Sequence, residues 1–260
     1  MDIIVCIKQV PDTTQEIKID PKTNTLIREG AKSIINPFDM YAIEESVRLK
    51  EKYSGKVTVI TMGPPQAEVA LREAVSLGCD EAILITDKAF AGSDTFVTSY
   101  VLACAIQKLK NYDLIICGKQ ASDGDTAQVG PGISAHLDIP QVTYVRKIEE
   151  IKDGIARFQR MTEEGYEVIE VFLPALITVV KEINEPRLAS LKGLIRAKQI
   201  NISRWTHKDL NLLPEDIGLK GSPTQVIKIF TPSRRLGGEI LQGEVDQIIE
   251  RLVEVLKREL

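Results

Sequence analysis

The stretch ICGKQASDGDTAQVGPGISAHL, from Ile116 to Leu137, begins as the end of an apolar strand and finishes as a helix. Between them lie Ser122, Thr126, two aspartates and the glycines Gly118, Gly124, Gly130 and Gly132. The first turn of a helix leaves backbone N–H groups unpaired and carries the positive end of the helix dipole, and glycines let a phosphate approach the backbone. The stretch therefore indicates either a phosphate-binding loop or a glycine-rich turn before a capped helix.

The chemistry of this loop is not that of the commonest nucleotide-binding motifs. It contains neither GxGxxG nor GxxxxGK[ST]. Thr126 and Gln128 can donate side-chain hydrogen bonds, whereas Asp123 and Asp125 argue against a cradle that works by positive charge alone. Each aspartate can instead cap the helix or accept a hydrogen bond from a ribose hydroxyl.

Strands and helices alternate on both sides of this loop in the first half of the chain. Strand-like segments at 3–8, 57–62, 82–86 and 113–117 are each followed by a helical pattern. The signals for the helix ends are Asn36 as N-cap with Pro37 behind it, Gly78 as a stop, Ser93 or Asp94 as N-cap, Lys110 as an end and Thr126 as a start. Four alternations predict an α/β fold with a Rossmann-like parallel-sheet core of the adenine-nucleotide-binding type.

The rest of the chain departs from this alternation. Ile17, Ile19, Leu26 and Ile27 suggest a small hairpin, and the segments 142–151, 154–162 and 166–180 predict antiparallel or mixed edge strands. Beyond Lys181 the sequence is irregular until a final amphipathic helix at about 244–258. We expect a nucleotide-binding α/β domain at 1–185 and an extended C-terminal arm at 186–260 that wraps a partner chain.

Composition excludes several classes of function. The 260 residues are 43% hydrophobic and 27% charged with a net charge of −4, which disfavours proteins that bind nucleic acid or anionic membranes. Met1 runs straight into a strand-like segment, and no apolar run approaches the ~20 residues that span a bilayer. We therefore expect a soluble, cytoplasmic protein without membrane insertion.

The cysteines and histidines offer little for metal or triad chemistry. The four cysteines, Cys6, Cys79, Cys104 and Cys117, lie in apolar settings without a CxxC pair, which is typical of buried thiols. His136 and His207 are the only histidines. The sequence predicts no metal site and no catalytic residue.

The carboxyl ends of the other predicted strands carry further polar and small residues. These ends are at 7–9, 61–63 and 93–95. Each alone reads as an ordinary loop, but parallel strands end at one edge of a sheet, where α/β proteins bind ligands. Their convergence with the 118–132 loop predicts a pocket in which the backbone of 6–8 reads an adenine edge.

Five long motifs resemble one family over essentially the whole chain. They are VCIKQVPDT, INPFDMYAIEESVRLKE, GKQASDGDTAQVGPGISAHLDIPQVT, RMTEEGYEVIEVFLPALITVVKEINEPRLASLKGLIRAKQ and TPSRRLGGEILQGE. This sequence is similar to the beta (small) subunit of electron transfer flavoproteins. The resemblance implies pairing with an alpha subunit that holds an electron-carrying FAD.

The resemblance also bears on the nucleotide in this chain. Family members hold AMP in this subunit when they are simple electron carriers, or a second FAD when they are electron-bifurcating. AMP-type members tend to have asparagine or another residue at the Thr126-Ala127 positions, and QTGQ where this chain reads Gln128-Val129-Gly130-Pro131. The loop DGDTAQVGPG resembles the bifurcating type, so the resemblance favours FAD, with AMP as the alternative.

The resemblance implies which residues bind the cofactor. The ADP part of FAD would be held by Cys6, Ile7, Lys8, Thr61, Met62, Gly63, Cys117, Gly118, Asp123, Gly124, Asp125, Thr126, Ala127, Gln128 and Val129. The segment Asn36-Pro37-Phe38-Asp39 would lie toward the flavin, with Thr95 and Thr98 near its ribityl or phosphate groups.

By the same resemblance, NADH would deliver hydride to the FAD of this subunit. One electron would then pass uphill to ferredoxin or flavodoxin, and the other through the alpha-subunit FAD to an acyl-CoA or 2-hydroxy-acid dehydrogenase. The redox chemistry belongs to the cofactor, and the chain binds and orients it. The resemblance implies that NADH is oxidised only when this chain is part of a complex.

The segment EPRLASLKGLIRAKQ matches the family's recognition loop, which docks on dehydrogenases. Leu191 would be its apolar anchor, with Lys192, Arg196 and Lys198 around it. The alternative is a connector whose leucine packs on its own chain.

Two other classes of protein are weighed as alternatives, and the first of them shares a similar α/β core. A nucleotide-sensing module like the universal stress proteins is disfavoured by the long tail beyond Lys181. The second class is the ATP-cleaving adenylating enzymes, which usually carry SGGxDS after the first strand. This chain reads KQVPDT there, which disfavours that class.

Overall fold

The computed structural model describes residues 1–12, 33–227, 238 and 240–259. In these residues, nine strands form one sheet in the order β11-β5-β4-β1-β6-β10-β7-β8-β9, and β2 (Gln9–Pro11) pairs with β3 (Ser33–Ile35) in a separate ribbon. The predicted hairpin at Ile17, Ile19, Leu26 and Ile27 lies outside the described residues.

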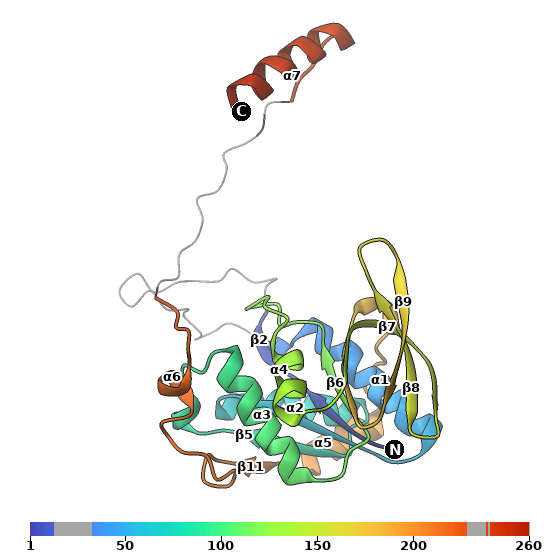
Figure 1. Ribbon diagram of the computed structural model, residues 1–260, viewed down its shortest axis with the longest axis vertical. Coiled ribbons are helices and arrows are strands. Elements are labelled where there is room, and N and C mark those ends of the chain that lie inside the picture. Colours follow the sequence, from blue (N-terminus) through green and yellow to red (C-terminus); the bar gives the residue numbers. More distant parts are fainter. Residues whose placement is uncertain (13–32, 228–237, 239, 260) are drawn as a thin grey trace.

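The predicted α/β alternation is confirmed (Figure 1). The strands are β1 (Asp2–Cys6), β4 (Lys56–Met62), β5 (Glu81–Ile85) and β6 (Leu114–Gly118), and all four run parallel. The helices are α1 (Pro37–Tyr53), α2 (Glu68–Leu77), α3 (Thr95–Leu109) and α4 (Val129–Leu137). The short 3-10 helices η1 (Pro65–Ala67) and η2 (Lys88–Phe90) lie in the connections.

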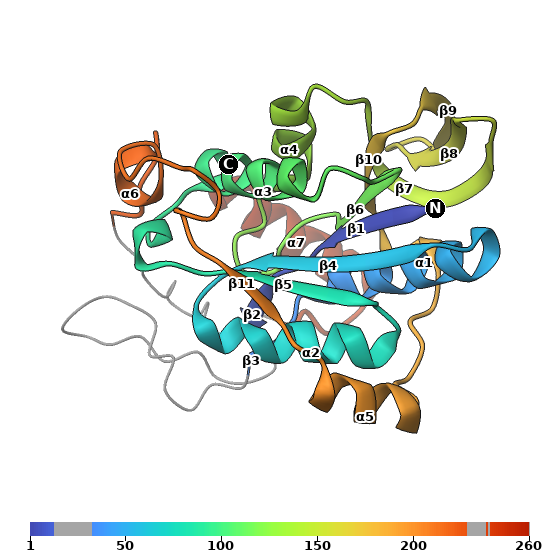
Figure 2. The same cartoon turned by 90° about the horizontal axis from the view of Figure 1, so that it is seen from below.

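Helices cover both faces of the sheet, so its central strands are apolar on both sides. Figure 2 shows α1 and α2 on one face and α3 and α4 on the other. Ile3 and Val5 of β1 point into the core under α1 and α2, whereas Ile4 and Cys6 point into the core under α3. This two-sided burial explains the uninterrupted apolar runs, because in a one-sided sheet apolar and polar residues alternate.

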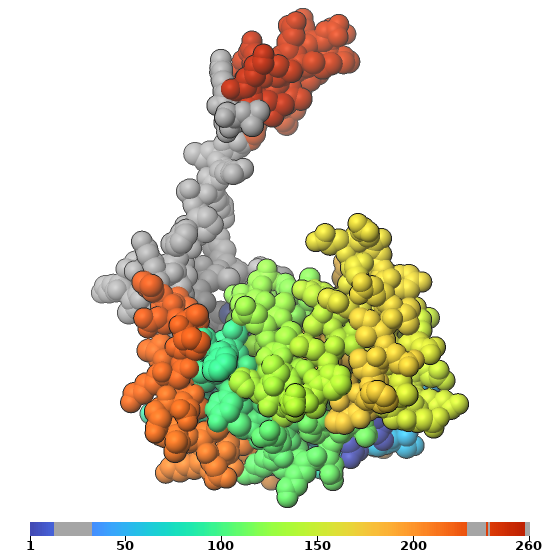
Figure 3. Space-filling model, viewed as in Figure 1, coloured from blue at the N-terminus to red at the C-terminus, as the bar shows by residue number. Residues whose placement is uncertain are grey.

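The segment after α4 is an antiparallel edge only in part. β7 (Gln141–Lys152), β8 (Ile155–Met161) and β9 (Tyr166–Phe172) form the predicted antiparallel edge, which projects from the body as a lobe (yellow in Figure 3). The expectation that 166–180 is all edge is wrong. Pro174 has no N–H for a ladder, and beyond it β10 (Ala175–Val179) is fully buried and parallel to both β6 and β7.

The chain beyond Lys181 is more regular than its sequence suggests. After η3 (Lys181–Ile183), α5 (Leu191–Gln199) packs outside α2, and β11 (Ser203–Trp205) adds a parallel strand beside β5. The short α6 (Gly218–Gly221) lies on η2, and the predicted final helix is α7 (Val245–Glu259). The division of the chain at 185/186 stays a prediction. None of the described helices is both long and apolar enough to cross a membrane.

Candidate nucleotide-binding site

The candidate site lies at the carboxyl ends of β1 and β6. These neighbouring strands lie where the chain order reverses, since β1 has β4 on one side and β6 on the other. Open α/β sheets bind ligands at such a switch point. Lys8 follows β1, and the loop 119–128 follows β6 and leads into α4. We call this region the nucleotide crevice.

Asn36 holds the loop 119–128 in place. The Nδ2 atom of Asn36 donates to the carbonyl of Gln120 at 2.8 Å, and its Oδ1 accepts from the backbone N–H of Ser122 at 3.0 Å. The residue stands at the N-cap position of α1, but its side chain makes no cap hydrogen bond, so the predicted capping role is wrong. Its backbone N–H donates to the carbonyl of Lys8, which ties β1, α1 and the loop together.

Asp39 is a buried carboxylate under the same loop. It is 5% exposed, and its Oδ2 accepts from the backbone N–H of Lys8 at 2.7 Å. Burial raises the pKa of Asp39 from its ordinary value of 3.8 to about 7. Hydrogen bonds from Lys8, Asn36 and Gly118 oppose this rise in the Asp39 pKa by stabilising the charged form. Asp39 therefore fastens the ends of β1 and β6 to the first turn of α1.

Gly118 is required by this close approach. A Cβ on Gly118 would lie 2.3 Å from Oδ1 of Asp39 and 2.7 Å from the backbone carbon of Phe38. No side chain fits there without moving the start of α1. The glycine thus allows the end of β6 to pack directly on the first turn of α1.

Two lysines bring positive charge to the crevice. The Nζ of Lys8 lies 2.6 Å from Oδ1 of Asp123, and this pair joins the end of β1 to the loop. The Nζ of Lys119 lies 5.6 Å from the ring centre of Phe38 and 5.4 Å from that of Tyr144, within the range of cation–π contacts. Lys119 thus links the first turn of α1 to β7.

The helix after the loop begins at Val129, three residues later than predicted. Asp125 and Ala127 have left-handed backbone angles, with φ of 53° and 54°, which a right-handed helix excludes. Among the described residues no side chain caps α4, so the first N–H groups of the helix, those of Val129 and Gly130, have no capping partner there. Thr95 donates to Oε1 of Gln128 at 2.9 Å and so joins α3 to this end.

Several predicted site residues use their polar groups in hydrogen bonds within the chain. The hydroxyl of Thr61 donates to the carbonyl of Ile7 at 2.7 Å. The N–H groups of Ile7 and Lys8 donate to the carbonyl of Ile60 and the carboxylate of Asp39, and the carbonyl of Lys8 accepts from the N–H of Asn36. The backbone polar groups of 7–8 therefore all have partners within the chain. Gly63 donates its N–H to the carbonyl of Ile85.

The remaining predicted residues form the surroundings of the crevice. Cys6 and Cys117 face each other on neighbouring strands, and their side-chain hydrogen bond, together with burial, raises the pKa of Cys117. Met62 packs against the core under α3, and Thr98 follows Thr95 by one helical turn. Gly124 lies in the exposed part of the loop, next to Asp123.

The residues present fit a nucleotide with phosphate groups. The start of α4 suits an anion, Lys8 and Lys119 bring cations to the loop that leads to it, and Asp123 and Asp125 provide acceptors for hydroxyl groups. Sequence reasoning missed the contributions of Lys119, Gln120 and Ser122, although all three lie in the quoted stretch. It also missed Tyr144, for which no local signal existed because it comes from a different strand.

The predicted docking residues lie on α5, which packs on the side of α2 that faces away from the sheet (Figure 2). Leu191 is 76% exposed, so it does not pack on its own chain as the alternative required. Lys192 is exposed beside it at the start of α5. Arg196 is partly used by the fold, since its Nη2 donates to the carbonyl of Asp80 at 2.7 Å.

Comparison with known proteins identifies the family. Residues 23–210 match the family described as the electron transfer flavoprotein domain. The chain is 54% identical to an electron transfer flavoprotein subunit beta from Thermoanaerobacterium thermosaccharolyticum over 259 residues, with 98% of each chain covered.

Two further relatives carry different names. The caffeyl-CoA reductase-Etf complex subunit CarD of Acetobacterium woodii is 51% identical, with 99% of this chain and 98% of that protein covered. Protein FixA of Azotobacter vinelandii is 48% identical, with 90% and 85% covered. The fold, the crevice at the switch point and these similarities over nearly full length agree, and the chain belongs to the family of electron transfer flavoprotein beta subunits.

Proposed function

We propose that this chain binds FAD in the nucleotide crevice and works in a heterodimer with an alpha subunit as an electron-bifurcating flavoprotein. The observation that carries the proposal is the crevice itself, where Asn36 holds a loop whose sequence from Thr126 to Pro131 resembles that of bifurcating members. An AMP-binding, non-bifurcating carrier is the alternative, because the ADP part of FAD and AMP share their adenosine and first phosphate.

The residues that would hold the cofactor are those of the loop and the strand ends around it. The N–H groups at the start of α4 and the ammonium of Lys8 would face the phosphates, and Asp123 or Asp125 a ribose. The segment from Asn36 to Asp39 would lie toward the flavin, as would Thr95 and Thr98 near its ribityl or phosphate groups. When bound, the flavin supplies two-electron chemistry with hydride donors and one-electron chemistry with carriers.

The electron donor and acceptors follow from the same proposal. NADH would be the donor, ferredoxin or flavodoxin the low-potential acceptor, and an acyl-CoA or 2-hydroxy-acid dehydrogenase the high-potential acceptor. The name of the Acetobacterium relative, a subunit of a caffeyl-CoA reductase-Etf complex, supports a partner that acts on a CoA ester. We place the protein in the cytoplasm, where NADH and these carriers are found.

The C-terminal part would provide the contacts with other proteins. α7 carries apolar side chains at spacings of three, four and seven residues, and Val245, Ile249, Leu252, Val253 and Leu256 are all at least 42% exposed. Such a stripe needs a partner surface, and we assign it to the alpha subunit. Leu191 and the cations beside it would dock on the dehydrogenase.

The test is electron transfer in the purified heterodimer. NADH would be supplied together with ferredoxin and an acyl-CoA dehydrogenase from the same organism. Bifurcation predicts that ferredoxin is reduced only when the dehydrogenase and its enoyl-CoA substrate are present, with equal numbers of electrons in both products. Transfer to the dehydrogenase without any reduction of ferredoxin would contradict bifurcation and favour the simple carrier.

A further inference from the structure

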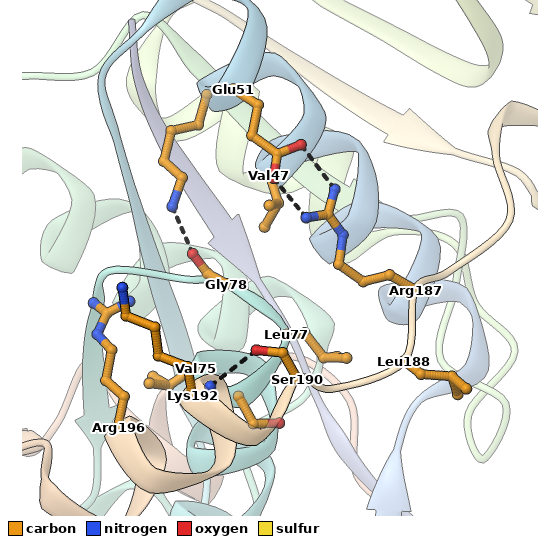
Figure 4. Close-up of a pocket in the computed structure, with 13 residues that line it drawn as sticks. Val47, Glu51, Val75, Leu77, Gly78, Arg187, Leu188, Ser190, Lys192 and Arg196 are labelled. Carbon is orange, nitrogen blue, oxygen red and sulfur yellow. Dashed lines mark hydrogen bonds and ion pairs between the residues drawn. The ribbon is translucent and has the colours of Figure 1, made fainter.

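A hollow of about 560 Å³ lies behind the proposed docking residues (Figure 4). Its walls are the last turns of α1, the end of α2 with Gly78, and the segment 187–196, which we call the strap. This volume is within the range of about 300–1,000 Å³ that is usual for ligand pockets, so it has room for several side chains.

The strap holds a fixed shape. The Nη1 of Arg187 lies 2.6 Å from Oε1 of Glu51, and its Nε lies 2.8 Å from Oε2 of Glu44, so the start of the strap is fastened to α1. Three residues later, Ser190 caps α5 by accepting from the N–H of Gly193 at 3.0 Å, and at the other end Arg196 donates to the carbonyl of Asp80 at 2.7 Å. The hollow therefore exists before any partner arrives.

Gly193 brings α5 close to α2. A Cβ on this residue would lie 2.1 Å from the carbonyl oxygen of Ser76 in α2, so only glycine permits the contact. Because α5 is seated this deeply, the strap stands as a wall of the hollow.

The strap carries exposed apolar side chains. Leu188, which lines the hollow, is 93% exposed, and Leu191, Leu194 and Ile195, which lie on the strap outside its lining, are each at least 47% exposed. Large apolar side chains gathered in this way mark a surface that meets another protein. Leu188 and the floor residues Val47, Val75 and Leu77 also give the hollow an apolar lining.

The charges in the hollow are unequal. Four cations line it, Lys50, Arg187, Lys192 and Arg196, against one anion, Glu51. Arg187 is neutralised by Glu44 and Glu51 of α1. Lys50 and Arg196 share one carboxylate, that of Asp80, at 3.0 and 3.6 Å. Lys192 has no ion pair among the described residues, so the hollow carries an excess of positive charge at its mouth.

We propose that the hollow receives an acidic segment of the partner dehydrogenase, with a carboxylate beside Lys192 and an apolar side chain against the Leu188 wall. The docking would then be reciprocal, with Leu191 reaching the partner and the partner's acidic segment reaching between α1, α2 and the strap. Complementary charge gives such a contact its register and raises its association rate. This inference rests on the proposed docking of a dehydrogenase at the strap.

The experiment compares two lysines of one helix. Lys192 lines the hollow, whereas Lys198 is exposed on α5 outside it. Lys192→Glu and Lys198→Glu change the net charge equally and would be made in the heterodimer with its flavin bound. The measurement is the rate of electron transfer to an acyl-CoA dehydrogenase of the same organism as a function of heterodimer concentration.

The hollow predicts that Lys192→Glu raises KM about tenfold with kcat unchanged, whereas Lys198→Glu raises KM at most about threefold. Lys192→Met should lie between Lys192→Glu and the unmodified protein. Equal effects of the two charge reversals would mean long-range steering only, and would overturn the proposal, as would no effect of either.

Flavin content, copurification of the alpha subunit and melting temperature must match those of the unmodified heterodimer, which shows that folding and assembly are intact. If the unmodified heterodimer transfers no electrons to the dehydrogenase, docking itself is refuted and this inference with it. If it transfers electrons and the two variants behave alike, only the acidic contact in the hollow is refuted.

Discussion

Asn36 and Ser122 are joined by a hydrogen bond of 3.0 Å from the backbone N–H of Ser122 to the side-chain oxygen of Asn36. The two residues are 86 positions apart, and the same amide donates to the carbonyl of Gln120. One side chain at the start of α1 therefore sets the path of the loop that forms the nucleotide crevice. Its role is to position the loop, since both of its polar atoms are used within the chain.

Replacing Asn36 should weaken nucleotide binding more than it weakens the fold. Asn36→Ala leaves the N–H of Ser122 and the carbonyl of Gln120 without their partner, which costs about 1–3 kcal/mol of stability. Because the loop loses its fixed path, we expect FAD affinity to fall about tenfold or more. Equilibrium titration of the unloaded heterodimer with FAD measures this.

The matched control is Asn184→Ala. The Nδ2 of Asn184 donates to the carbonyl of Tyr41 and to Glu45, each at 3.0 Å, and so also fastens a distant segment to α1. It should lower stability to a similar extent without changing FAD affinity. Equal losses of affinity in both variants would show that the effect of Asn36 is general destabilisation.

Gly118→Ala should be severely destabilising. The new methyl group would overlap Asp39 and the backbone of Phe38, neither of which can move without shifting α1. We expect a loss of at least about 3 kcal/mol, or no soluble protein, by urea denaturation. Gly124→Ala, in the same loop, meets nothing within 4 Å and should change stability by less than about 0.5 kcal/mol. Similar stability of both variants would refute the close packing at Gly118.

Because of Asp39, the free energy of unfolding should fall as the pH rises from about 4 to about 7. Its pKa is about 7 in the fold and near 3.8 when the chain is unfolded, so between these values the folded state binds more protons than the unfolded state. Stability from this group therefore falls from about pH 4 to pH 7 and is level above that. The difference of about 3 between the two pKa values of Asp39 corresponds to a loss of about 4 kcal/mol in the free energy of unfolding across this pH range.

The measurement is the difference in free energy of unfolding between Asp39→Asn and the unmodified protein at pH 5, 6, 7 and 8. Asparagine has nearly the same shape and can still accept from the N–H of Lys8. The variant should gain relative stability up to about pH 7 and no more beyond it. A difference that does not vary with pH would mean that Asp39 is charged throughout this range.

Leu191→Ala should slow electron delivery to the dehydrogenase while flavin content stays the same. The side chain is 76% exposed, so its removal leaves the fold intact but deletes the proposed anchor. Leu213→Ala, at another exposed leucine, is the control. Unchanged transfer rates in Leu191→Ala, measured against dehydrogenase concentration, would remove this residue from the docking surface.

The alternating core was predictable because strand and helix patterns are local. The apolar runs at 3–8 and 113–117, and stops such as Gly78, depend on neighbours in sequence, and the structure confirms them. The place of β10 was not predictable in this way. Its apolar run is compatible with a strand at the edge of the sheet and with one at its centre. Only the pairing of β10 with β6 and β7 shows that it is a central strand.

The structure brings the ends of β1 and β6 together at one edge of the sheet, as predicted, but the hydrogen-bond partners of the residues there were not predictable. Asn36 has the typical sequence of an N-cap, and its actual partners are more than 80 residues away. The start of α4 moved to Val129 because Asp125 and Ala127 adopt left-handed angles, which few residues other than glycine signal in a sequence. Long-range hydrogen bonds and unusual backbone angles leave little trace in a local pattern.

The most direct test of the account is a count of cofactors. The chain would be coexpressed with its alpha subunit, the purified heterodimer denatured, and the released FAD and AMP measured by chromatography. If this chain binds FAD, the heterodimer releases two FAD and no AMP. One FAD with one AMP would contradict the account and make the protein a simple carrier, and a heterodimer without any nucleotide in this chain would mean that the crevice has been misassigned.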